Sequence, residues 1–311
     1  MTSPSAQDNP ARDQLLQLFI QANQKSLPAM AEHVMELIFQ LGESRVTVQE
    51  LTNTILKDYA LTSKILQLVN SAYYSGGTPI STVSRAVTVV GLEAMRQLAT
   101  AMALLDEFLK QGAEHAEITK HFSLSLVSAT MSRLYCEEAR PNLSTEEAYL
   151  CTLLHRLGAL VVLVYLPDQY WRVAQLIRQG YSEDYASGLA LNGMTFNQIG
   201  REVATYWNFP KRTVACMDPV PSCPVSGNCD AFLLLHNLVV YSNTLTSTFF
   251  NGTDLDFAEL VLRFGPLLDL DRTQSMELLD RAIGICENFT PAINESLGKL
   301  QRQRDQRIVA N

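Results

Sequence analysis

The residues from Leu150 to Pro167 form an almost continuous apolar run, which limits the folds open to this chain. Only His155 and Arg156 interrupt it. A run of this length with few turn residues predicts a helix that is apolar on all sides and buried in a core. We expect it to be too short and too interrupted to span a bilayer. Ser144 is the expected N-cap, its hydroxyl accepting an N–H near Glu147.

Helical periodicity continues along the rest of the chain, and no segment shows the alternation of a half-buried strand. Two β-branched runs, 87–90 and 161–164, lie inside helical patterns. The sequence therefore predicts an all-α, multi-helix bundle. The expected helices span about residues 13–22, 28–42, 47–56, 61–74, 81–90, 92–109, 118–138, 150–167, 169–178, 183–191, 195–207, 230–249, 254–264, 274–288 and 291–308.

Charge and the N-terminal residues narrow the possible partners. A net charge of -8 and a pI near 5.2 argue against a nucleic-acid binder that depends on bulk positive charge. Residues 1–5 lack the basic flank and apolar core of a signal peptide. We expect a cytoplasmic protein with reduced thiols that has neither a membrane nor nucleic acid as its partner.

Five short segments in the first third of the chain occur in a recognisable order. Together they resemble the HDOD family, an all-helical relative of the HD-domain phosphohydrolases found in bacterial signalling proteins. The resemblance implies an HD-like bundle with an N-terminal helical lobe. The segments are Leu27–Met30, Leu56–Thr62, Asn70–Tyr74, Ala86–Val87 and Val90–Glu93.

This resemblance also implies a domain organisation. An HDOD domain would cover about residues 20–217, with the N-terminal lobe reaching to about residue 112 and an HD-like core after it. Residues 1–19 would be a tail and the start of the first helix. Residues 218–227 contain three prolines and a glycine and are expected to form a linker. Residues 228–311 would then form a C-terminal helical extension.

Within the HD-like core, the resemblance points to an altered metal centre. Leu153–Gly158 resembles the segment in which an active HD hydrolase carries adjacent histidine and aspartate residues. Here those two positions are His155 and Arg156. The residues around Ser125 resemble those that follow the first metal-binding histidine, which places Leu124 at that position.

A second histidine position is altered in the same way. Gly193 and Ile199 resemble residues that flank a further metal-binding histidine, which places Phe196 there. His121 lies three residues before Leu124 and is expected to face elsewhere on the helix. The resemblance thus implies that His155 alone remains of these expected ligands.

Electrostatics gives an independent reason to doubt a metal. A divalent ion needs several anionic or imidazole ligands, whereas Arg156 is cationic at any ordinary pH. Two unit charges about 4 Å apart interact by about 4 kcal/mol at an effective dielectric near 20, and a divalent ion doubles this to roughly 8 kcal/mol of repulsion. We therefore predict no cofactor, no catalytic metal and no phosphohydrolase activity of the HD type.

Two interpretations of the remaining pair stay open. His155 and Arg156 could bind an anion such as a nucleotide phosphate. Alternatively, His155 is a hydrogen-bonded core histidine, and Arg156 pairs with a carboxylate such as Glu147 or Glu202.

The segment Asn70–Tyr74 also has two interpretations. Tyr73 and Tyr74 could supply aromatic area for docking a partner or ligand. Alternatively, Asn70 and Ser71 satisfy carbonyl groups at a helix end while the tyrosines seal two lobes, which is the interpretation we favour.

A zinc site is a weaker possibility. Cys216, Cys223, Cys229 and His236 are spaced more widely than the CxxC pairs of ordinary structural zinc sites. We favour structural or incidental thiols.

Three functions follow from these observations. The first is a non-catalytic signal-transduction scaffold that contacts other signalling proteins. The second is a metal-dependent phosphohydrolase acting on a nucleotide or phosphoester with ligands that are not aligned here. The third and weakest is a small-molecule or nucleotide sensor with a pocket between the HD-like core and the C-terminal helices.

Overall fold

The computed structural model describes residues 10–21, 30–42, 45–70, 80–139, 143–218 and 230–310, and these residues form helices and no strand. The predicted all-α fold is thus confirmed. The N-terminal helices are α1 (Pro10–Gln21), α2 (Glu32–Gly42), α3 (Val48–Leu56), α4 (Tyr59–Val69), α5 (Val83–Val90) and α6 (Leu92–Gln111).

The remaining helices build the core around α7 and the C-terminal part of the chain. They are α7 (His115–Ala139), α8 (Thr145–Leu154), α9 (Leu157–Tyr165), α10 (Pro167–Arg178), α11 (Glu183–Ala190), α12 (Phe196–Tyr206), α13 (Lys211–Ala215), α14 (Ala231–Asn251), α15 (Asp254–Leu268), α16 (Arg272–Glu287) and α17 (Pro291–Ala310). The short helix α13 was not expected from the sequence.

Local signals account for several helix boundaries. The capping box predicted at Thr47 is present, with Glu50 as its reciprocal partner. Ser144 caps α8 and accepts the Glu147 N–H, as expected. Gly91 has a φ of 95°, a conformation that favours glycine, and here α5 and α6 are bent from one another by 119°.

The long apolar run is not one helix, which corrects the first expectation. It is divided into α8 and α9 by a turn at His155 and Arg156, the two polar residues whose side chains take partners on other segments. Counted together, Thr145–Tyr165 are long and apolar enough to cross a membrane, as are α5 and α6 if that bent pair is one span. Within Thr145–Tyr165, however, 89% of the most apolar window is buried in the protein, as in a core helix.

A close helix crossing brings α12 against the start of α9. A Cβ atom added to Gly158 would lie 1.8 Å from the carbonyl oxygen of Phe196 and 2.7 Å from the Gly200 nitrogen. Glycine at position 158 therefore permits this approach. Its consequence is that Phe196 lies beside the turn that carries His155 and Arg156.

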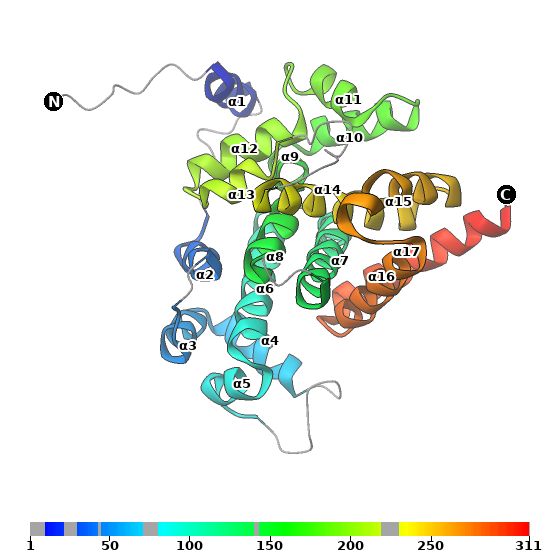
Figure 1. The fold of residues 1–311 in the computed structure, drawn as a ribbon. Helices are drawn as coiled ribbons and strands as arrows, with labels where there is room; N and C mark the ends of the chain where they lie inside the picture. Colours follow the sequence, from blue (N-terminus) through cyan, green and yellow to red (C-terminus); the bar gives the residue numbers. More distant parts are fainter. Residues whose placement is uncertain are drawn as a thin grey trace.

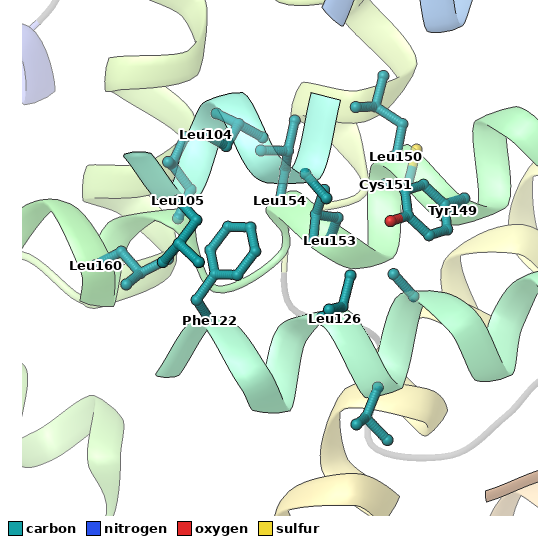
Figure 2. Packing of buried hydrophobic residues seen from close by; sticks show 14 of the residues in the cluster. Leu104, Leu105, Phe122, Leu126, Tyr149, Leu150, Cys151, Leu153, Leu154 and Leu160 are labelled. Atoms are coloured by element: carbon teal, nitrogen blue, oxygen red, sulfur yellow. The ribbon is translucent and has the colours of Figure 1, made fainter. Parts of the chain in front are cut away.

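Helix α7 is the element around which the core packs. It contacts α6, α8 and α9 on one side and α14, α16 and α17 on another (Figure 1). Figure 2 shows Phe122 and Leu126 of α7 facing leucines of α6, α8 and α9. Buried hydrogen bonds join the C-terminal helices to α7, including one from the Tyr135 hydroxyl to the Leu268 carbonyl at 2.8 Å. Residues 230–310 therefore share this core, while the predicted linker from 219 onward lies outside the described residues.

Candidate functional site

One cavity of about 460 Å³ brings together all four positions that the sequence singled out in the HD-like core. Leu124 comes from α7, Phe196 from the first turn of α12, and His155 and Arg156 from the turn between α8 and α9. Helix α10 forms another wall. Helix α14 closes the cavity with residues that lie far along the chain, namely Asn243, Thr244, Ser247, Thr248 and Asn251.

Arg156 is held by a carboxylate that the sequence did not indicate. Its two terminal nitrogens donate to the two carboxylate oxygens of Glu183, at 3.0 and 2.8 Å. The expected partners are engaged elsewhere, because Glu147 pairs with Arg212 and Glu202 lies near Arg201. Glu183 begins α11, whose position over the turn is a tertiary feature. The two side chains remain 34% and 35% exposed, so the pair is not sealed in the core.

His155 is neutral and hydrogen-bonded, as the structural interpretation expected. Its Nδ1–H donates to the carbonyl oxygen of Cys216 at 3.0 Å, which leaves Nε2 as an acceptor. Burial lowers the pKa of His155 to about 4, and the nearby charge of Arg156 adds to this effect.

His121 lies in the same cavity, contrary to the expectation that it faces elsewhere. Residues three and four apart on a helix share a face, so His121 lies on the same side of α7 as Leu124. Its Nε2–H donates to the Tyr170 hydroxyl, which in turn donates to Glu117 at 3.2 Å. Burial lowers the pKa of His121 to about 3, and the charge of Arg156 makes a smaller contribution in the same direction.

The cavity does not offer a donor set that fits a divalent metal. Across the described ranges, no three His, Cys, Asp or Glu side chains are grouped so as to hold a metal ion. The Glu183 carboxylate is occupied by Arg156, and Glu117 is bonded to Lys120 and Tyr170. A metal bound beside Arg156 would also meet a fixed positive charge.

The weaker zinc possibility is only partly visible. Cys216 is fully buried, and the His236 side chain is 2.7 Å from the Asp218 carbonyl, to which its Nε2–H donates. Cys223 and Cys229 lie outside the described residues. This possibility therefore remains an untested prediction.

Asn70 fits the structural interpretation. Its Nδ2 donates to the carbonyls of Leu66 and Ile80 at 2.8 and 2.7 Å, and its Oδ1 accepts the Ile80 N–H at 2.7 Å. The side chain thus ends α4 and ties it to the segment before α5. Ser71, Tyr73 and Tyr74 lie outside the described residues.

Sequence reasoning missed two features of the cavity. Ser125 served only as an alignment marker, yet the residue lines the cavity, and its buried Oγ has no hydrogen-bond partner within the described part of the chain. The α14 wall was also missed. Asn243, Ser247 and Asn251 recur four positions apart on this helix, a spacing that marks one face.

Comparison with known proteins identifies the family. The HDOD domain profile matches residues 27–219, more than half of the chain, and the chain belongs to the HDOD family. A curated relative, an uncharacterized protein of Treponema pallidum (strain Nichols), is 23% identical over 235 residues. The match covers 73% of this chain and 43% of that protein, so the chain spans less than half of the relative's length.

Solved structures share the fold at low sequence identity. An HDOD domain protein of unknown function from Geobacter sulfurreducens has a TM-score of 0.65 at 19% identity, covering 94% of this chain and 97% of that one. A candidate phosphohydrolase from Shewanella amazonensis SB2B also has a TM-score of 0.65 at 19% identity, covering 92% and 97%. A candidate signal transduction protein from Marinobacter aquaeolei VT8 has a TM-score of 0.66 at 18% identity, covering 96% and 68%.

Proposed function

We propose that this HDOD protein is a non-catalytic regulatory protein that works by contacting other signalling proteins. The observation that carries the proposal is the Arg156–Glu183 pair in the cavity lined by the former HD positions. A guanidinium with a bidentate carboxylate supplies neither an open coordination position nor a metal-bound water for hydrolysis. The signal-transduction description of a structural relative supports a regulatory role.

Exposed aromatic side chains support the protein-contact part of the proposal. Tyr181 and Tyr185, 46% and 55% exposed, stack with ring centroids 5.3 Å apart at the α10–α11 connection. Leu189 on α11 is 51% exposed. Aromatic residues of this kind are enriched in protein interfaces.

The catalytic alternative is tested by turnover and metal content together. We expect purified protein to show no hydrolysis of bis(4-nitrophenyl) phosphate with added Mn²⁺ or Mg²⁺, and well under one bound metal per chain. Arg156→Asp is the matched variant, because it restores a carboxylate at the altered position. Chelator-sensitive turnover by the natural chain that changes in this variant would establish a phosphohydrolase.

The contact proposal is tested by recovery of partners from native cells. We expect Tyr185→Ser to reduce recovery of specific partners relative to the natural chain. Tyr59→Ser is the control, because Tyr59 is 87% exposed and lies on α4, away from this aromatic pair. Equal recovery with both variants would argue against the α10–α11 surface.

A sensor is the second candidate function. It is favoured by the cavity itself, which lies where the third hypothesis expected a pocket, between α7 and the C-terminal helix α14.

A further inference from the structure

An unsatisfied hydroxyl marks the inner wall of the cavity. Ser125 is 1% exposed, and its Oγ has no hydrogen-bond partner among the residues that the structure describes. A buried polar group left without a partner destabilises the folded protein. Its neighbour Ser123 is equally buried but donates to the Thr119 carbonyl at 2.7 Å. Ser125 is thus a cavity-lining residue whose hydroxyl is left available for a hydrogen bond.

The charges around the cavity leave an excess of one cation. Glu117 is paired with Lys120, and Glu183 with Arg156. Arg178 lines the same cavity and has no ion-pair partner in the described ranges. Because both histidines are neutral, the cavity favours a ligand that carries a negative charge.

Aromatic side chains of α10 and α12 line part of the cavity. Tyr170 and Phe196 stack with centroids 6.4 Å apart and an interplanar angle of 28°. Trp171 packs edge-on against Tyr170 and remains 38% exposed. Aromatic faces of this kind favour a planar ring in the ligand.

We propose that this cavity binds a small organic anion with a planar ring, whose charged group competes with Glu183 for Arg156 and whose polar edge bonds to Ser125. The inference rests on the proposed function, since it assigns the cavity to binding and not to hydrolysis. The anionic group could be a phosphate monoester or a carboxylate, because a guanidinium accepts either in a bidentate manner.

Matched probes separate the charge from the ring. For phosphate, the probe is adenosine 5′-monophosphate, compared with neutral adenosine and with ringless ribose 5-phosphate. For carboxylate, the probe is 4-hydroxybenzoate, compared with neutral 4-hydroxybenzyl alcohol. By titration calorimetry we expect at least one planar anion to bind saturably. Its neutral or ringless counterpart should bind at least about tenfold more weakly. Failure of both planar anions to bind, or equal binding of the counterparts, overturns the proposal.

Variants then assign the bound groups. Ser125→Ala should weaken binding of the successful anion about fivefold, because one hydrogen bond is lost, without lowering the melting temperature of the free protein. Ser123→Ala is the control and should leave affinity unchanged. Affinity that is equal in the natural chain and Ser125→Ala would remove Ser125 from the site.

Competition with Glu183 has its own signature. Arg156→Gln should lower affinity about tenfold or more, whereas Glu183→Gln should raise it severalfold because the competing carboxylate loses its charge. Reduced affinity in a folded Glu183→Gln variant would contradict competition, even if Arg156→Gln failed to fold. Binding followed by hydrolysis of adenosine 5′-monophosphate would refute the non-catalytic role and leave the ligand site standing. If no probe binds and none is hydrolysed, only the proposed ligand site is refuted.

Discussion

Two paired arginines, Arg96 in the N-terminal lobe and Arg156 in the cavity, differ in how far they are buried. In the lobe, Asn70 bonds backbone groups of Leu66 and Ile80, and Arg96, 4% exposed, pairs with Glu93, whose side chain is 42% exposed. In the cavity, the Arg156–Glu183 pair is about one-third exposed. The two arginines therefore have different consequences for the protein. The Arg96 guanidinium is buried among the helices, while the Arg156 guanidinium is in contact with solvent.

Removing the enclosed arginine is expected to have the largest effect on stability. Arg96→Met should lower the free energy of unfolding by about 2 to 3 kcal/mol, because it removes the charge-assisted hydrogen bond from the buried guanidinium to Glu93. Protonation of Glu93, whose pKa burial raises to about 7, limits this loss at neutral pH. Chemical denaturation measures this. A loss no larger than that of Arg156→Gln would remove the contrast between the two regions.

Asn70→Ala tests the hydrogen bonds that the Asn70 side chain makes to backbone groups in the N-terminal lobe. It removes three hydrogen bonds to backbone groups and should cost about 2 kcal/mol of folding free energy, measured by urea denaturation. Asn53→Ala is the control, since Asn53 is exposed and bonds only the Gln49 side chain among its described contacts. An Asn70→Ala protein of natural stability that loses a partner would favour docking over the structural role.

The two regions should respond to pH in opposite directions. Burial raises the pKa of Glu93 to about 7, with a further contribution from Glu146, so its stabilising term is lost as the pH rises from about 4.5 to about 7. Burial lowers the pKa of His155 to about 4, so its term is lost as the pH falls from about 6.5 to about 4.

Single substitutions separate the contributions of Glu93 and His155 to the pH dependence of stability. Glu93→Gln should raise the melting temperature at pH 8 more than at pH 5. His155→Asn should reduce the loss of stability on acidification between pH 6.5 and pH 4. If the melting temperatures of each variant and the natural chain change with pH in the same way, between pH 5 and 8 for Glu93→Gln and between pH 6.5 and 4 for His155→Asn, neither group titrates as described.

Breaking the open pair is expected to have the smallest effect on stability. Arg156→Gln should change the free energy of unfolding by at most about 1 kcal/mol, because a partly exposed ion pair gains little over its hydration. Thermal melts at low and high salt measure this. A large loss would place Arg156 with Arg96 as a structural residue.

The helical fold could be predicted from sequence, since periodicity reports local geometry, and the four positions singled out in the HD-like core do line one cavity. The partner of Arg156 could not, because Glu183 follows it by 27 residues and reaches it only when α11 lies over the turn. His121 was misplaced by a wrong reading of helix spacing and not for lack of a signal.

The sequence by itself determined most of the helices, several of their caps and the position of Arg156 beside His155 in the apolar run, because these depend on near neighbours along the chain. Tertiary structure alone decided that the apolar run would divide at His155 and Arg156, and that α14 would wall the cavity beside an unsatisfied Ser125. These features arise from helices that approach one another from distant parts of the chain, where packing and the need for hydrogen-bond partners select the final arrangement.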